Sequence, residues 1–195
     1  MNLSFIQPSV MFPSCNIYQL VTGGMASNCY LLVDKETRET IIIDPGDDSE
    51  YIVDSVTLLG ITPMAIVATH GHFDHVLGGF AVEHSFDIPF YMNSKDRFLL
   101  DRMQESAKHF LGVRDTDPPP VVTNDLLEGT AVRFGKTILS SFSSPGHTPG
   151  SMTLTVKGCR VLFVGDVLFA GGGTGRTDHT YADRSALISS ITHIL

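Results

Sequence analysis

Short runs of apolar and β-branched residues open the chain and predict β-strands. They lie at 17–22, 28–33 and 40–43, and glycine pairs or charged turns separate them. Strands joined by such short turns run in opposite directions. The pattern therefore predicts an antiparallel meander, which the Asp44-Pro45-Gly46-Asp47 segment ends.

Strands and helices alternate in the middle of the chain. Ser49 can cap a helix and Gly60 can end it, so a helix is expected between them. The pattern then predicts a strand at 63–68, a helix from near 76 to 86, a strand at 90–92 and a helix from about 95 to 110. Residues 114–125 include three consecutive prolines and cannot be helical. They are expected to be a surface connection that forms a rim over the functional site.

Strand patterns return in the last third of the chain. Predicted strands lie at 132–134, 137–142, 151–156 and 160–164, and a tight hairpin at Lys157-Gly158 joins the last two. A closing helix is expected from Arg184 to Leu195, because its apolar residues form one face. Both halves combine strands with a following helix. The predicted fold class is therefore α/β, with two packed sheets and helices outside them, a four-layer αββα sandwich.

The composition narrows the class of protein. With 195 residues, of which 43% are hydrophobic and 17% charged, the chain is expected to form a single domain spanning 1–195. The formal net charge is −8 and there is no lysine or arginine cluster, so nucleic acid is not an expected partner. No apolar stretch reaches the roughly 18 residues that a membrane span needs, so no membrane association is expected.

The three cysteines, Cys15, Cys29 and Cys159, are far apart in the sequence. An odd number without a close pair argues against a disulfide framework and is typical of a reducing compartment. Residues 1–14 carry no lysine or arginine and are interrupted by prolines, so no signal or transit peptide is predicted. A cytoplasmic protein is therefore expected, with Cys29 and Cys159 in its core.

Four side chains of the kinds that bind metal ions lie within six residues, at His70, His72, Asp74 and His75. They directly follow the predicted strand at 63–68, which would place them at the edge of a sheet. Imidazoles two residues apart, such as His70 and His72, point the same way and converge on one ion. Asp74 and His75 are then expected to face a neighbouring position.

Two further segments contain residues that could bind a metal ion. His147 lies between two Pro-Gly turns that restrict its backbone, and Asp166 follows Gly165 at a predicted strand end. Three imidazoles form an open site that suits Zn²⁺, and an oxygen-richer site beside it suits Zn²⁺, Fe or Mn. One or two metal ions are expected, with zinc first and Fe or Mn as alternatives.

Five motifs, in this order, resemble the metallo-β-lactamase superfamily and, within it, the glyoxalase II-like (hydroxyacylglutathione hydrolase-like) small hydrolases. They are Asp44-Pro-Gly46, Thr69-His-Gly-His-Phe-Asp-His75, Gly146-His-Thr-Pro-Gly-Ser151, Gly165-Asp-Val-Leu-Phe169 and Gly175-Arg-Thr-Asp178. The resemblance covers nearly the whole chain and implies the metallo-β-lactamase fold.

The resemblance also implies roles for individual residues. The implied metal ligands are His70, His72 and His147 for a first ion, Asp74 and His75 for a second, and Asp166 between the two. Asp44 would orient a ligand histidine. Arg176 and Asp178 would support the site or contact substrate, or they simply pair with each other at the surface; both alternatives stay open.

The implied activity is metal-dependent hydrolysis of a thioester, such as an acyl-glutathione, by attack of metal-bound hydroxide. Asp74 is the expected catalytic residue, which orients the nucleophile, and a small-molecule thioester is the expected partner. Two alternatives stay open. One is a persulfide dioxygenase-like enzyme with a single iron on His70, His147 and Asp166, and the other is a non-catalytic metal-binding fragment.

The sequence departs from the family pattern at its end. Family members continue past the helix at 184–195 into another strand and a Pro-Gly-His-Gly-like turn, whose histidine completes the second metal site. This chain lacks the final strand and its histidine loop, and His193 inside the predicted helix is no substitute. The domain is therefore interpreted as truncated at the C-terminus. The isolated His84, His109 and His179 are not expected to bind metal.

Overall fold

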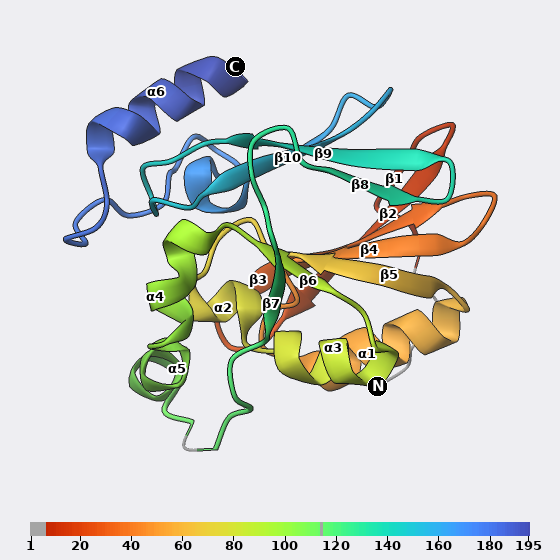
Figure 1. The fold of residues 1–195 in the computed structure, drawn as a ribbon, viewed down its shortest axis with the longest axis horizontal. Helices are drawn as coiled ribbons and strands as arrows, with labels where there is room; N and C mark the ends of the chain where they lie inside the picture. The colour runs from red at the N-terminus through yellow and green to blue at the C-terminus, as the bar shows by residue number, and fades with distance from the viewer. Residues whose placement is uncertain (1–6, 114) are drawn as a thin grey trace.

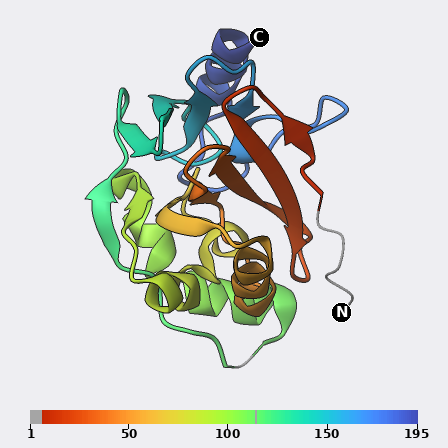
Figure 2. The same ribbon diagram turned by 90° about the vertical axis from the view of Figure 1, so that its right-hand side faces the viewer.

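The computed structural model describes residues 7–113 and 115–195, which form four layers (Figure 1, Figure 2). Helix α6 (Arg184–Ile194) covers a smaller sheet, and α1 (Ser49–Leu59) and α3 (Gly79–Phe86) lie on the outer face of a larger one. Figure 2 shows the two sheets stacked between these helices. The predicted αββα sandwich is confirmed.

The larger sheet has the strand order β1-β2-β3-β4-β5-β6-β7 over the described residues. Its strands are β1 (Val10–Met11), β2 (Cys15–Thr22), β3 (Ser27–Asp34), β4 (Glu39–Ile43), β5 (Thr62–Val67), β6 (Phe90–Met92) and β7 (Val122–Asp125). Strands β1 to β4 are antiparallel, as in the predicted meander, and β4 to β7 are parallel. Parallel neighbours need a crossover, and the helices between these strands supply it.

The smaller sheet has the order β11-β10-β9-β8 and is antiparallel. Its strands are β8 (Ala131–Phe134), β9 (Thr137–Ser143), β10 (Met152–Val156) and β11 (Leu162–Phe163). The loop predicted as a tight hairpin at Lys157-Gly158 is longer than expected, because the pairing of β10 with β11 stops at Thr155 and Leu162.

Apolar side chains fill two cores, one between the larger sheet and its helices and one between the two sheets. In β4, Ile42 belongs to the first core, and Ile41 and Ile43 belong to the second. A strand that is buried on both faces has no polar alternation, which explains the continuous apolar run in the sequence. Across residues 7–113 and 115–195, no helix combines the length and apolar character that crossing a membrane requires.

The first helices begin and break at residues that the sequence pattern did not identify. Helix α1 is capped by Asp48, whose carboxylate accepts the Tyr51 N–H at 3.2 Å, and not by Ser49. The helix expected from near 76 to 86 forms two helices, α2 (Phe73–Val76) and α3. Between them, the Gly78 N–H donates to the Gly46 carbonyl, which binds the joint to the loop after β4.

The segment between β6 and β7 also differs from the prediction. The helix expected at 95–110 is divided into a 3₁₀ turn, η1 (Ser94–Asp96), and the helices α4 (Arg97–Leu100) and α5 (Met103–Leu111). The connection expected at 114–125 ends early, because 122–125 form β7. The prolines of this connection precede β7, so β7 keeps the backbone N–H groups that it needs to pair with β6. Arg114 lies outside the described residues.

Asp34 links the turns of the two sheets. Its buried carboxylate accepts hydrogen bonds from the Glu36 N–H (3.0 Å) and from the N–H and hydroxyl of Thr37 (3.0 and 3.2 Å). It also accepts the Lys136 N–H (3.1 Å) and the Thr137 hydroxyl (2.7 Å) of the β8–β9 turn. Burial raises the pKa of Asp34, but these hydrogen bonds lower it by more, so the folded pKa lies below its ordinary value.

Replacing Asp34 should therefore destabilise the fold in a pH-dependent way. Asp34→Ala should lower the free energy of unfolding by roughly 1–3 kcal/mol at neutral pH, because its donors lose their acceptor. A depressed folded pKa gives stability that is present above the unfolded pKa of 3.8 and is lost as pH falls through the folded pKa. Urea unfolding at neutral pH and near pH ~3 should show the two proteins converging in acid. Asp54→Ala, on the exposed face of α1, is the control. An equal loss of unfolding free energy in both variants would contradict the role of Asp34 as a buried hydrogen-bond acceptor.

Candidate metal centre

Loops from both sheets meet at one edge of the sandwich. Residues 69–75 directly follow β5, His147 lies between β9 and β10, and Asp166 lies in a 3₁₀ turn, η2 (Gly165–Val167), after β11. The Met152 N–H donates to the Thr69 carbonyl at 2.8 Å and joins the sheets here. Each sheet therefore delivers its own group of polar side chains to the same place.

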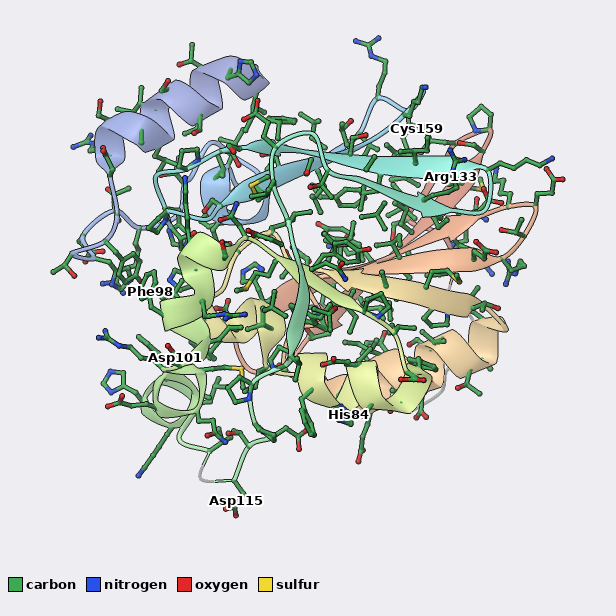
Figure 3. The ribbon with its side chains drawn as sticks, in the orientation of Figure 1. His84, Phe98, Asp101, Asp115, Arg133 and Cys159 are labelled. Atoms are coloured by element: carbon green, nitrogen blue, oxygen red, sulfur yellow. The ribbon has the colours of Figure 1, made fainter. Side chains whose placement is uncertain are left out.

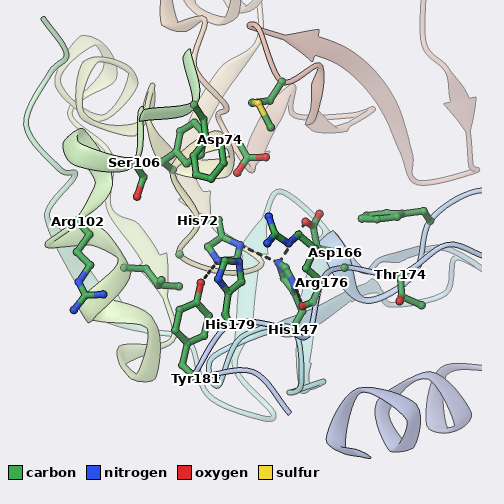
Figure 4. Close-up of a pocket in the computed structure, with 17 residues that line it drawn as sticks. His72, Asp74, Arg102, Ser106, His147, Asp166, Thr174, Arg176, His179 and Tyr181 are labelled. Carbon is green, nitrogen blue, oxygen red and sulfur yellow. Dashed lines mark hydrogen bonds and ion pairs between the residues drawn. The ribbon is translucent and has the colours of Figure 1, made fainter. Parts of the chain in front are cut away.

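Four of the predicted ligands lie together. His70, His72, His147 and Asp166 each present one ligand atom, and these atoms lie within 4.8 Å of one another. His72 Nδ1 lies 3.1 Å from His70 Nε2 and 2.9 Å from His147 Nε2. Figure 4 shows His72 beside His147, with Asp166 next to them. The structure thus brings His147 and Asp166 of the smaller sheet to the two histidines of the larger one.

Hydrogen bonds on the outer side of each ring decide which nitrogen carries the proton. Thr69 Oγ1 donates to Asp44 Oδ2 (2.7 Å), so it accepts from His70 Nδ1 (3.1 Å). The carbonyl oxygen of Arg176 accepts from His147 Nδ1 at 2.8 Å. In both rings Nε2 then has a lone pair that points into the cluster. Lone pairs that converge in this way fit a bound cation.

The electrostatics of the cluster favour the neutral form of His70 and His72. Burial, followed by the charges of neighbouring histidines, holds the pKa of His70 well below its ordinary value. Burial and then His147 lower the pKa of His72 to about 3. Neutral imidazole is the form that binds metal ions. His70 and His72 are therefore in the ligand form at neutral pH.

Asp166 lies between this cluster and a second group. Its Oδ2 is 3.4 Å from His147 Nε2, and its Oδ1 is 3.2 Å from His75 Nε2. Asp74 Oδ2 lies 3.5 Å from the same His75 nitrogen. Burial lowers the pKa of His75, but hydrogen bonds to Asp166 and Asp44 outweigh burial and raise the pKa well above its ordinary value. Two carboxylates thus face one ring nitrogen, an arrangement that requires a proton or a cation between them.

Asp44 supports both groups from behind. Its carboxylate accepts hydrogen bonds from the Thr69 N–H (2.7 Å), the Thr69 hydroxyl (2.7 Å) and His75 Nδ1 (3.0 Å). Asp44 also has a φ of +50°, in the left-handed region that few residues other than glycine adopt. It orients His75 directly and His70 through Thr69, the kind of role that the resemblance implies.

Asp96 is a supporting residue that the sequence did not single out. Its buried carboxylate accepts hydrogen bonds from the Gly71 N–H (3.0 Å), the Thr148 hydroxyl (2.7 Å) and the Gly150 N–H (2.7 Å). Burial raises the pKa of Asp96 by more than these hydrogen bonds lower it. Asp96 therefore ties the loop after β5 to the loop that carries His147. No motif marks it, because its partners are distant in the sequence.

Tyr181 is a second residue without a sequence signal. Its Oη lies 2.8 Å from His72 Nε2, so the other nitrogen, Nδ1, is turned toward the cluster. Tyr181 stacks on His179, with ring centroids 5.0 Å apart, and meets Phe98 edge-on at 5.1 Å. His179 is not among the clustered ligand atoms.

Arg176 and Asp178 pair with each other at the surface. Arg176 donates from Nε and Nη2 to the two oxygens of Asp178, at 2.9 and 2.7 Å. Their side chains thus follow the surface-pair alternative, while the Arg176 backbone supports His147 through its carbonyl. The preceding Gly175 allows this approach, because a Cβ there would lie 2.6 Å from His147 Nδ1.

A cavity of about 450 Å³ opens beside the ligands (Figure 4). The candidate ligands that line it are His72, Asp74, His147 and Asp166. Its apolar lining comes from Met25, Phe73, Leu99, Phe110 and Phe169. None of the described residues of 114–125 lines this cavity, so the rim predicted there is wrong. That segment leads instead into β7, at an edge of the larger sheet.

Sequence comparison identifies the class of protein. A family model described as "Metallo-beta-lactamase superfamily" matches residues 22–190, which include every residue of the centre described above. The class is that of metallo-hydrolases, and the cluster of three histidines and Asp166 agrees with a metal cofactor. The chain belongs to the metallo-β-lactamase superfamily.

Three curated relatives differ in their named activities. The chain is 34% identical over 179 residues to hydroxyacylglutathione hydrolase GloC of Haemophilus influenzae, covering 90% of this chain and 82% of that protein. It is 33% identical over 175 residues to the probable metallo-hydrolase YqgX of Bacillus subtilis, covering 89% and 80%. It is 30% identical over 163 residues to the mitochondrial persulfide dioxygenase ETHE1 of Mus musculus, covering 83% and 56%.

A solved structure is similar in fold and carries metal. The crystal structure of TTHA1623 in a di-iron-bound form superposes with a TM-score of 0.73 at 29% identity. The match covers 97% of this chain and 85% of that one. This likeness fits a metal cofactor at the cluster and leaves the identity of the metal open.

Replacing one of the two acceptor oxygens of Asp96 should weaken the centre without touching a candidate ligand. Asp96→Asn keeps the volume of the side chain but turns an NH₂ group toward buried donors. It should lower metal affinity by roughly 10–100-fold and the free energy of unfolding by about 1–3 kcal/mol. Chelator competition and urea unfolding measure these effects. Asp101→Asn, at the exposed end of α4, is the matched control. Equal metal affinity in the two variants would show that the hydrogen bonds of Asp96 do not support the metal centre.

Proposed function

We propose that the chain is a metal-dependent hydrolase of thioesters, with an acyl-glutathione as the type of substrate. The observation that carries the proposal is the convergence of three imidazole nitrogens, from His70, His72 and His147, beside a largely apolar cavity. The likeness to hydroxyacylglutathione hydrolase GloC supports the thioester class.

The ligand sets follow from the positions of the donor atoms. In the proposal, His70, His72, His147 and Asp166 hold one ion, and Asp166 shares a second with Asp74 and His75. Zinc suits three imidazoles best, with Fe or Mn as alternatives. When bound, such an ion supplies the Lewis acidity that makes water a nucleophile near neutral pH.

Asp74 is the proposed catalytic residue because one of its oxygens remains available. Its Oδ2 accepts the Ser27 hydroxyl at 2.8 Å and lies 3.5 Å from His75 Nε2. Within the described part of the chain, no hydrogen bond engages Oδ1, and the side chain lines the cavity. Oδ1 can therefore accept a hydrogen bond from water and orient it for attack.

The cavity walls favour a substrate with an apolar part and an anionic end. Phe73, Leu99 and Phe110 provide the apolar surface. Arg102 also lines the cavity, and among the described residues no carboxylate forms an ion pair with it. A guanidinium group in this state can bind a carboxylate in bidentate fashion. A thioester of glutathione, whose peptide part carries carboxylates, meets both requirements.

A persulfide dioxygenase-like oxidoreductase is the second candidate. The 30% identity to the mouse persulfide dioxygenase favours it. That activity would use one iron on His70, His147 and Asp166 and would not require His72 as a ligand. His72 therefore separates the two candidate functions.

The purified protein should contain metal by elemental analysis and release thiol from S-lactoylglutathione. His72→Ala should lower the rate of this hydrolysis by roughly 10²-fold or more, because a metal ligand is lost. His193→Ala, on the exposed side of α6, should leave the rate unchanged. Unaltered hydrolysis in His72→Ala, or a single iron with oxygen consumption on glutathione persulfide, would favour the dioxygenase instead.

Arg102→Ala should affect substrate binding more than the chemical step. We expect KM for S-lactoylglutathione to rise about tenfold, with kcat within about twofold, because the lost contact is made before and during the reaction. A neutral thioester without carboxylates should show no change in KM. Arg97→Ala, a loss of the same charge at the start of α4, is the control. An equal effect on charged and neutral thioesters would contradict an anion-binding role.

A further inference from the structure

Two cysteines that are 144 positions apart in the sequence lie side by side. Cys15 Sγ is 3.9 Å from Cys159 Sγ, and Ser14 Oγ is 3.7 Å from the same Cys159 sulfur. Cys15 opens β2 in the larger sheet, whereas Cys159 lies in the β10–β11 loop of the smaller sheet. Cys159, which was expected in the core, is only partly buried. The pair therefore spans the two sheets.

The pair is separate from the candidate metal centre. Figure 3 shows Cys159 on the opposite side of the molecule from Phe98 and Asp101, which belong to the α4 region beside the cavity. Neither Cys15 nor Cys159 lines the cavity or belongs to the ligand cluster. The two thiols are therefore not part of the candidate metal centre.

We propose that Cys15 and Cys159 form a reversible intramolecular disulfide by exchange with a small-molecule disulfide such as glutathione disulfide. In the first step, the Cys159 thiolate attacks one sulfur of the small disulfide, forms a mixed disulfide and releases one thiolate. In the second step, the Cys15 sulfur attacks Cys159 Sγ, displaces the second thiolate and passes its proton to that departing thiolate. Two cysteine thiols are oxidised by two electrons, and one small disulfide is reduced to two thiols.

Exposure decides which cysteine reacts first. Cys159 is partly exposed, whereas Cys15 has 0% exposure. Burial, followed by the proximity of Cys159, raises the pKa of Cys15 to about 12, which makes it a poor nucleophile toward a dissolved disulfide. Cys15 can still attack a sulfur that is already held beside it. The geometry therefore assigns the entering role to Cys159 and the resolving role to Cys15.

Closure of the bond requires a small movement of one loop. The sulfurs must approach from 3.9 Å to the bonded distance of about 2.05 Å. Cys15 is held in register opposite Asp34 on β3. Cys159 instead follows Gly158, which has a φ of +82° and open space around it. The movement therefore falls on the β10–β11 loop and leaves the sheet pairing of β2 intact.

The disulfide would join the two sheets covalently. It would close a loop that contains most of the chain, and such long loops restrict the unfolded state strongly. The oxidised protein should therefore show a Tm higher than the reduced protein by roughly 4–16 °C.

Thiol counting on the folded, purified protein tests the proposal. After incubation with glutathione disulfide, the remaining thiols are alkylated in denaturant and the intact mass is measured. Alkylation should fall from three cysteines to one, with no glutathione attached. Peptide mapping should find Cys15 linked to Cys159 and alkyl label on Cys29, and dithiothreitol should restore all three thiols. Three free thiols, a persistent glutathione adduct or a disulfide between two molecules would each overturn the proposal.

Single replacements check the order of the steps. Cys15→Ser should stop at a mixed disulfide on Cys159, because the resolving thiol is gone. Cys159→Ser should leave its two remaining cysteines free, because Cys15 and Cys29 are both buried. Cys29→Ser is the matched control and should form the disulfide as the wild type does. A glutathione adduct on Cys15 in the Cys159→Ser variant would contradict the assigned order.

Discussion

Buried carboxylates hold the candidate metal centre together. Removing imidazoles from water costs free energy unless their polar atoms find partners inside the protein. Asp44 and Asp96 each accept three hydrogen bonds from the loops that carry the candidate ligands. Because both carboxylates are buried, they depend on these donors as much as the donors depend on them. The loops are therefore expected to form as a unit.

The candidate metal centre is formed by residues from both sheets. The larger sheet supplies His70, His72, Asp74 and His75, and the smaller sheet supplies His147 and Asp166. Asp96 bridges the two contributions, and the Met152 N–H bonds to the Thr69 carbonyl at the same edge. An ion that takes ligands from both sides binds only the assembled sandwich, so its binding free energy also stabilises the fold.

Local patterns predicted the elements that depend on neighbouring residues. The run at 90–92 matches β6, and four of the six predicted ligands cluster because each follows or precedes a strand whose end is visible in the sequence. Features that depend on distant partners gave no signal. Asp96 and Tyr181 acquire their roles only when separate loops meet, and 122–125 become a strand only because β6 is available to pair with them. The cysteine pair is of the same kind, since folding alone brings its members together.

The boundary between the sheets is secured differently at its two ends. At one end, ligand loops and buried carboxylates join the sheets. At the other, the Asp34 carboxylate binds the β8–β9 turn, and Cys15, directly opposite Asp34 in the β2–β3 pairing, lies against Cys159. The apolar core between these ends resists separation, but the hydrophobic effect that drives its burial has no preferred direction. Directional contacts at both ends therefore fix how one sheet lies on the other, and that alignment sets the positions of ligands drawn from both sheets.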